Sequence, residues 1–149
     1  MSRPVRAALV SVSATELTSA EKRLLEEYNP LGVSLFNRNI ATPQQLQKLI
    51  ADIKETLNRE DALIAVDQEG GRVRRLREPD FRAYAGQQTL GRLDTEVSPA
   101  AAQKAVKIQA TLIAADLHSL GINLNYAPVL DVRSPQTAPV LSSRIFSDN

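Results

Sequence analysis

Four short apolar runs alternate along the chain with longer segments in which apolar residues recur at helical spacing. The runs cover residues 7–12, 32–36, 63–66 and 122–126. The first run suits a buried strand, and the third is apolar throughout, which is typical of a strand covered on both faces. Helical spacing predicts helices between the runs. This order of alternating strands and helices, with short links after the first two strands, predicts a parallel sheet in an α/β fold.

Local signals set the ends of the predicted helices. Thr18 and Glu21 have the spacing of a capping box, and Pro30 ends the first helix near residue 28. The second helix opens over residues 42–45, with proline at its first position and a glutamine closing the box. A third helix opens at Ser98-Pro99, and Gly121 is its natural stop.

A long, arginine-rich stretch from residue 67 to about residue 97 follows the third strand, and its pattern is largely irregular. Loops of this length are uncommon in compact domains and are usually functional or disordered. Neither a tandem repeat nor a linker divides the sequence. We therefore expect one domain over residues 1–149.

Composition excludes several kinds of site. The chain has 149 residues, a formal net charge of +1, no cysteine and one histidine, His118. Disulfides, thiolate catalysis and polyhistidine metal sites are therefore excluded, and we predict neither a metal nor a cofactor. His118 is interpreted as structural or solvated. The charge balance argues against nucleic acid as a partner, despite the arginines at 72–77. The start of the sequence lacks a secretory pattern and the sequence has no spanning run, so we expect a soluble cytoplasmic protein without membrane association.

Charged and amide side chains gather just after the predicted strands, where sites form in parallel α/β folds. Carboxylates and guanidiniums at one rim suit a polyhydroxylated ligand, because they supply acceptors and donors for hydroxyl groups. Alternatively, Asp67, Glu69 and Arg72 form a structural ion-pair network. The rim or supporting candidates are Arg38, Asn39, Glu69, Arg72 and Asp131. Asp131 could contact a ligand or pair with Arg38.

Five segments together resemble the bacterial β-N-acetylglucosaminidases of glycoside hydrolase family 3. They are GVSLFNRNI, TPQQLQKLI, LIAVDQEGGRVRRL, INLNYAPVLDV and SSRIF. The resemblance implies the N-terminal half, strands one to four, of a (β/α)8 barrel. It also implies retaining hydrolysis of terminal non-reducing β-linked N-acetylglucosamine, without a cofactor. The implied role is cytoplasmic peptidoglycan recycling, on muropeptides, by a monomeric parent enzyme.

The resemblance also assigns substrate-binding residues. By motif match, Asp67 binds sugar hydroxyls, and Arg75 and Arg144 are sugar-binding arginines. Ile145 replaces the serine that the family usually has after the last of these. The family's acid/base histidine and nucleophilic aspartate are expected beyond Asn149, so no residue of the chain is assigned as catalytic. A barrel needs roughly 250 residues, and we expect a truncated chain that is inactive alone.

Two other interpretations stay open. One is a non-catalytic sugar-binding or half-barrel assembly module, in which two copies cover each other's exposed strands. The other is a complete flavodoxin-like domain, which the family resemblance disfavours.

Overall fold

The computed structural model describes residues 3–147, which form two compact units. Within the described residues, the first unit comprises residues 3–67 and Leu117–Asn125, and the second comprises Gln68–Asp116 and residues 126–147. Each unit is described by itself below. The expectation of one domain over residues 1–149 stays a prediction.

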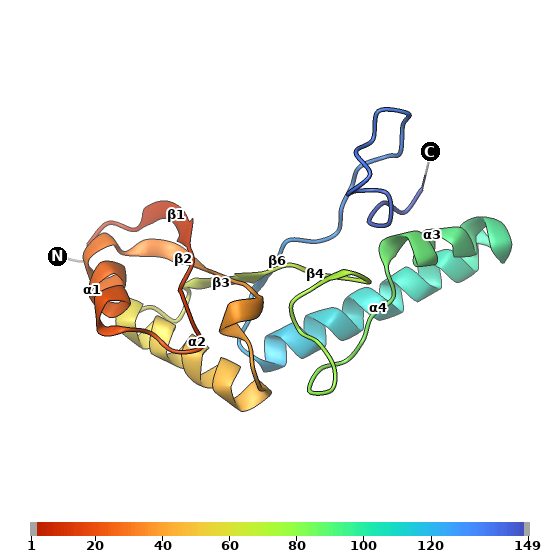
Figure 1. The fold of residues 1–149 in the computed structure, drawn as a ribbon. Coiled ribbons are helices and arrows are strands. Elements are labelled where there is room, and N and C mark those ends of the chain that lie inside the picture. The colour runs from red at the N-terminus through yellow and green to blue at the C-terminus, as the bar shows by residue number, and fades with distance from the viewer. Residues whose placement is uncertain (1–2, 148–149) are drawn as a thin grey trace. The chain divides into compact units, whose positions relative to one another are not determined.

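A parallel sheet forms the centre of the first unit (Figure 1). In the described part of the chain, it contains β1 (Arg6–Val10), β2 (Pro30–Leu35), β3 (Leu63–Val66) and β6 (Leu124–Asn125), in the order β1-β2-β3-β6. Leu35 pairs with Val66, and Val66 pairs with Asn125. The four strands correspond to the four apolar runs, and they lie in the sheet in the same order as in the chain. The predicted fold class, the first four strands of a (β/α)8 barrel, is therefore confirmed.

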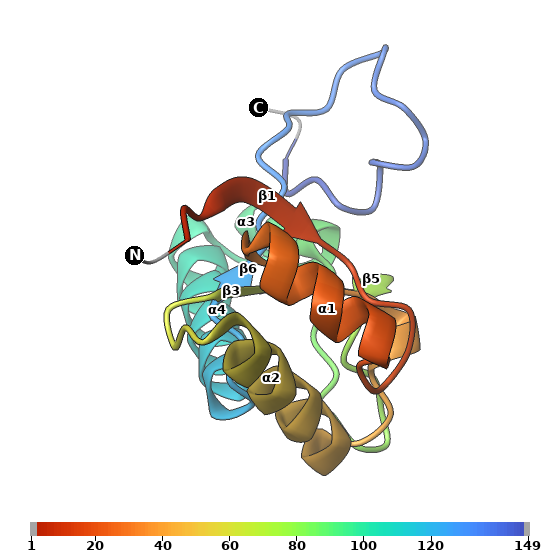
Figure 2. The same ribbon diagram turned by 90° about the vertical axis from the view of Figure 1, so that its left-hand side faces the viewer.

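Helices α1 (Ser19–Tyr28) and α2 (Pro43–Leu57) lie side by side on one face of this sheet (Figures 1 and 2). The capping box of α1 forms as predicted between Thr18 and Glu21. At α2, the Thr42 hydroxyl accepts from the backbone N–H of Gln45, but the Gln45 side chain accepts from Ala41 at 2.8 Å. The box therefore closes one residue earlier than the predicted pattern.

The core of the first unit joins β2 and β3 to one stripe of α2. Ile64, Ala65 and Val66 are fully buried, which confirms that β3 is covered on both faces. The strands approach closely, because a Cβ on Gly32 would lie 1.9 Å from the carbonyl oxygen of Leu63. The apolar stripe of α2 that the sequence predicts is buried here: Leu46, Leu49, Ile50, Ile53 and Leu57.

The prediction that the first run forms a buried strand is wrong. Residues of β1 are mostly exposed, and Val10 keeps 37% of its surface accessible. Within residues 3–147, β1 pairs with β2 alone. An edge strand lacks a neighbour on one side, and its apolar residues consequently remain accessible.

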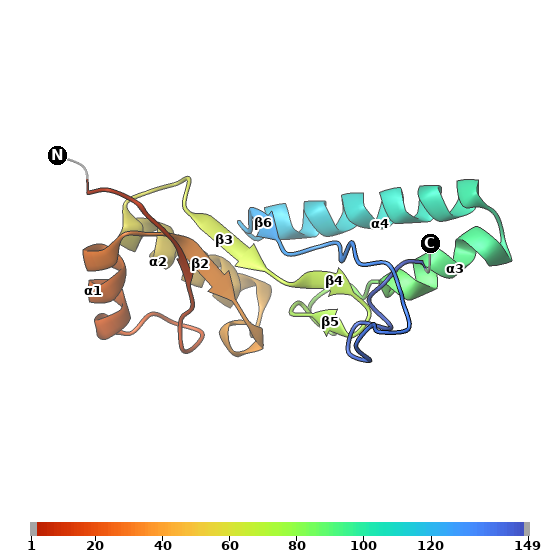
Figure 3. The same ribbon diagram turned by 90° about the horizontal axis from the view of Figure 1, so that it is seen from above.

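The second unit contains regular structure where the sequence predicts an irregular stretch. β4 (Gln68–Gly70) and β5 (Val73–Arg74) pair antiparallel, and α3 (Gln87–Glu96) lies alongside α4 (Pro99–Ser119), whose last turn belongs to the first unit (Figure 3). The N-cap of α3 is Gly86, which offers no side-chain cap. Distant contacts favour α3 instead. A Cβ on Gly91 would lie 1.7 Å from the carbonyl oxygen of Phe146, so the C-terminal segment packs directly on this helix.

Candidate functional site

Asp67 is the residue that follows β3 directly, at the carboxyl end of a strand in which Ile64, Ala65 and Val66 are fully buried. Its side chain is partly exposed. The strand end fixes the position of the backbone, and the residue as a whole is half-buried. Its assigned role in binding sugar hydroxyls stays a prediction.

Asn39 and Arg38 support the loop that follows β1. Asn39, in the short helix η1 (Asn37–Asn39), is fully buried and donates to the carbonyls of Val12 at 3.0 Å and Ala14 at 2.8 Å. Arg38 also donates to the Val12 carbonyl, at 3.0 Å, and its guanidinium lies 4.8 Å from the centroid of the Phe36 ring. These contacts agree with a supporting role for both residues, and their assignment as rim or supporting residues stays a prediction.

Gln68 organises the β4–β5 turn, and the sequence analysis missed it. Its side chain is buried, and its oxygen accepts from the backbone N–H of Arg75 at 2.9 Å and of Leu76 at 3.1 Å. These bonds fix the backbone from which the Arg75 side chain departs. A buried amide can satisfy such backbone groups across a turn, but the sequence shows only that a glutamine follows Asp67.

Glu69 and Arg144 form a bidentate ion pair within the second unit, although 75 positions separate them. Arg144 donates from Nε to Oε2 at 2.9 Å and from Nη2 to Oε1 at 2.6 Å. The Glu69 side chain is only 3% exposed and that of Arg144 is 25% exposed. The buried carboxylate therefore orients a guanidinium that still reaches solvent. The ion pair agrees with a supporting role for Glu69, and both this role and sugar binding by Arg144 stay predictions.

Ile145, the departure from the family pattern, is fully buried beside this pair. An apolar side chain here adds to the core of the second unit. Gln87 of α3 reaches the same segment: with its amide oriented to suit both neighbours, it donates to the carbonyl of Arg144 and accepts from the N–H of Val129 at 3.2 Å. Arg144 is thus anchored through both its side chain and its backbone.

The remaining candidates do not form the predicted network. Glu69 pairs with Arg144 rather than with Arg72, and the exposed Arg72 donates to the carbonyl of Val140. Asp131 is exposed. The prediction of an ion-pair network is therefore wrong for Glu69 and Arg72, which do not pair with each other.

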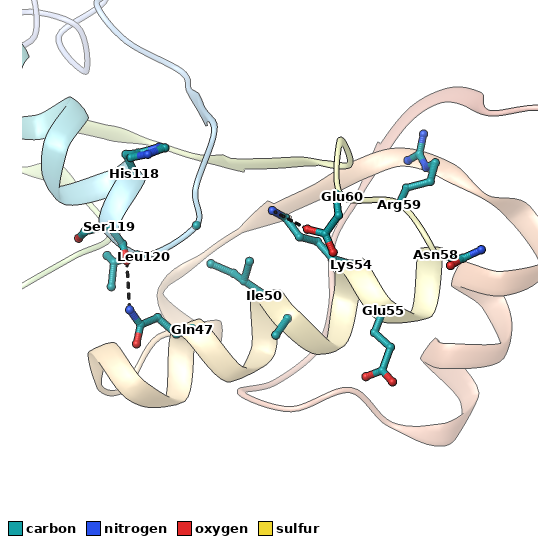
Figure 4. A pocket seen from close by; sticks show the side chains of 12 residues that line it. Gln47, Ile50, Lys54, Glu55, Asn58, Arg59, Glu60, His118, Ser119 and Leu120 are labelled. Atoms are coloured by element: carbon teal, nitrogen blue, oxygen red, sulfur yellow. Dashed lines mark hydrogen bonds and ion pairs between the residues drawn. The ribbon is translucent and has the colours of Figure 1, made fainter.

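A pocket of about 780 Å³ in the first unit lies at the other end of the sheet (Figure 4). It is lined by α2, by residues 58–60 before β3 and by residues 118–121 before β6, so it faces the amino ends of these strands. Lys54 and Glu60 face each other across 3.8 Å, and Gln47 donates to the carbonyl of Ser119 at 3.0 Å. Basic and acidic side chains line it together, and the assigned sugar-binding residues do not. We assign it no role in substrate binding.

Two findings bear on metals and membranes. Among residues 3–147, the structure holds no cluster of three or more histidine, cysteine, aspartate or glutamate side chains that could ligate a metal ion. In the same residues, no helix combines the length and apolarity that crossing a bilayer requires.

Comparison with known proteins finds similarity to glycosyl hydrolases of family 3. The family described as the glycosyl hydrolase family 3 N terminal domain matches residues 6–149. A beta-hexosaminidase of Idiomarina loihiensis is 37% identical over 93% of the chain, and one of Xanthomonas axonopodis pv. citri is 39% identical over 94%. The chain spans about 40% of the length of these two relatives.

Solved structures agree with this assignment. NagZ from Neisseria gonorrhoeae, in complex with N-trifluoroacetyl-D-glucosamine, matches 98% of the chain at 33% identity with a TM-score of 0.90, and the chain covers 42% of it. A family 3 β-N-acetylglucosaminidase from Paenibacillus matches 95% of the chain at 31% identity with a TM-score of 0.78, and the chain covers 26% of it.

Proposed function

Since the chain belongs to glycosyl hydrolase family 3, we propose that it supplies the sugar-binding N-terminal part of an enzyme that hydrolyses terminal non-reducing β-linked N-acetylglucosamine. The observation that supports this most is the match of nearly the whole chain to a protein crystallised with an N-acylated glucosamine. The chemistry of the rim residues agrees with such a ligand.

In this proposal the chain binds and orients the sugar. The Asp67 carboxylate accepts hydrogen bonds from two neighbouring hydroxyls, and the Arg75 and Arg144 guanidiniums donate to sugar oxygens. Glu69 holds Arg144 in one orientation, so that little rotamer freedom is lost when the sugar binds. Retaining hydrolysis needs a nucleophile and an acid/base group, and we assign neither to this chain.

We propose further that the substrate of the whole enzyme is a muropeptide carrying N-acetylglucosamine, and that the enzyme is a cytoplasmic monomer in peptidoglycan recycling. These finer statements rest on the resemblance to the bacterial β-N-acetylglucosaminidases. The net charge of +1 suits a substrate recognised by hydroxyl and amide groups better than a polyanion.

A titration with two sugars tests the proposed binding. N-Acetylglucosamine, added to the isotopically labelled chain, is expected to shift the amide signals of residues 67–75 in a saturable manner, and glucose is expected to do so more weakly. Equal shifts with both sugars would contradict an N-acetylhexosaminidase site. An absence of saturable shifts with either sugar would contradict sugar binding altogether.

Turnover separates binding from catalysis. We expect the pure 149-residue chain to release no chromophore from an aryl N-acetyl-β-glucosaminide, because the proposal assigns it neither catalytic group. Turnover that disappears in Asp67→Asn would show that the chain holds its own catalytic machinery and would overturn this division of roles.

A non-catalytic assembly module is the second candidate function, and the exposed edge strand β1 favours it. Two copies could cover each other's edges. Light scattering during size-exclusion chromatography distinguishes the candidates: a discrete dimer favours the module, whereas a monomer or an aggregate contradicts it.

A further inference from the structure

The Gly70–Gly71 turn, which connects β4 to β5, rests directly on the backbone of residues 84–86. A Cβ on Gly70 would lie 2.3 Å from the carbonyl oxygen of Ala85, and one on Gly71 would lie 2.8 Å from the Cα of Gly86. The N–H of Gly71 donates to the carbonyl of Tyr84 at 2.9 Å. Both glycines have positive φ angles, 93° and 59°, which favour glycine. The conformation of the turn therefore depends on where residues 84–86 lie.

Helix α4 fixes residues 84–86 through two side chains. The amide of Gln109 accepts from the N–H of Ala85 at 3.0 Å and donates to the carbonyl of Ala85 at 3.0 Å. Seven residues later, on the same face of the helix, Asp116 accepts a hydrogen bond from the hydroxyl of Tyr84. One side chain thus satisfies both backbone groups of Ala85, and the other anchors the preceding residue.

The state of Tyr84 suits this role. Tyr84 is 8% exposed, and burial, together with the hydrogen bond to Asp116, raises the pKa of Tyr84 to about 12. The hydroxyl consequently stays protonated at neutral pH and keeps donating to the carboxylate. Arg82 lies 3.9 Å from the same carboxylate and adds a compensating charge.

We propose that Gln109 and the Tyr84–Asp116 pair are positioning residues for the sugar-binding turn. They hold residues 84–86, these hold the Gly70–Gly71 turn, and the turn sets the directions of Glu69 on one side and Arg75 on the other. This inference rests on the proposed function, because the turn matters only if its flanking residues serve the sugar. Displacing a ligand-binding group by about 1 Å is enough to weaken its contacts severely.

Amide hydrogen exchange on the whole 149-residue chain tests the structural part. In Gln109→Ala, the amides of Ala85 and Gly71 are expected to exchange about tenfold faster, because the first loses its acceptor and the second loses its support. Gln103→Ala is the matched control, since Gln103 is exposed on the same helix. The amide of Asn123, bonded to the Ile64 carbonyl at 3.1 Å in the first unit, reports whether the whole chain is destabilised.

Titration of the same variants with N-acetylglucosamine tests the functional part. We expect a severalfold weaker affinity for Gln109→Ala and an unchanged affinity for Gln103→Ala. If Gln109→Ala does not fold, Tyr84→Phe serves as the second variant, because it removes the hydroxyl and keeps the buried ring. Asp116→Asn is expected to retain affinity better than Asp116→Ala, since an amide oxygen can still accept from Tyr84.

The outcomes separate the two proposals. Unchanged Gly71 exchange in both Gln109→Ala and Tyr84→Phe would overturn the positioning role. Unchanged sugar affinity in these variants would overturn it as well, provided that the unsubstituted chain binds. If the unsubstituted chain binds no sugar while Gly71 exchange responds, the proposed function fails and the support of the turn by α4 stands.

Discussion

Replacing Glu69 with glutamine removes one charge from the pair that anchors the C-terminal segment of the second unit. Glutamine has nearly the same shape as glutamate, so the substitution leaves little empty space. It leaves the guanidinium of Arg144, whose side chain is 25% exposed, facing a neutral amide inside the protein.

The expected cost follows from burial. Removing one partner of a buried ion pair costs roughly 3–5 kcal/mol. Water can solvate the exposed quarter of Arg144, and the glutamine oxygen still accepts one hydrogen bond, so we expect the free energy of unfolding to fall by about 2–3 kcal/mol. For a chain of this size, that corresponds to a decrease in Tm of about 5–10 °C.

The assay is thermal and urea unfolding followed by circular dichroism, with Glu96→Gln as the matched control. Glu96 pairs with Arg92 at 2.9 Å on the surface of α3, where the two side chains are 56% and 64% exposed. Its replacement is expected to cost less than about 0.5 kcal/mol. Equal losses for the two variants would refute the conclusion that burial makes the Glu69 pair important. Coupling between Glu69→Gln and Arg144→Gln, measured in a double-mutant cycle, would confirm that the loss belongs to this contact.

Two further predictions concern single contacts. Gly70→Ala is expected to lower the free energy of unfolding by about 2–4 kcal/mol, because the φ of 93° disfavours any side chain and the new Cβ would meet the Ala85 carbonyl. The control Gly86→Ala, whose new Cβ would have its nearest contact 3.5 Å away, should change the free energy of unfolding by less than about 1 kcal/mol. Similar urea midpoints for the two variants would contradict this account. Burial raises the pKa of Glu21 and the hydrogen bonds from Thr18 and Ser13 lower it, with a net value of about 2 against an ordinary 4.5. The stabilisation by ionised Glu21 is therefore complete above about pH 4.5 and is lost as pH falls toward 2. In urea titrations, the difference in free energy of unfolding between the unsubstituted chain and Glu21→Gln should narrow as pH falls from 4.5 to 2. A difference that stays constant over this range would refute the role of ionised Glu21.

Local sequence signals predict the parts of the fold that depend on near neighbours. The Thr18–Glu21 capping box and the stop at Gly121 form as expected, because their partners lie within a few residues. The apolar run of β3 correctly indicates burial on both faces. The same reasoning fails for β1, since the apolar run cannot show whether a neighbouring strand will cover it.

Long-range contacts account for what the sequence does not show. Helix α3 lacks a side-chain N-cap, and it packs against the backbone of Phe146, 55 residues beyond Gly91, so its own sequence carries few helix signals. The partner of Glu69 lies 75 positions away. The sequence pattern places Asp67 correctly after a buried strand, but it cannot show that Gln68 fixes the backbone of Arg75.

The affinity of the chain for N-acetylglucosamine in Asp67→Asn and Asp61→Asn tests the central claim most directly. Asp61 precedes β3 and Asp67 follows it, so the two variants remove the same charge at opposite ends of one strand. We predict that calorimetric binding disappears in Asp67→Asn and stays unchanged in Asp61→Asn. Binding of the sugar by Asp67→Asn as tightly as by the unsubstituted chain would contradict the claim.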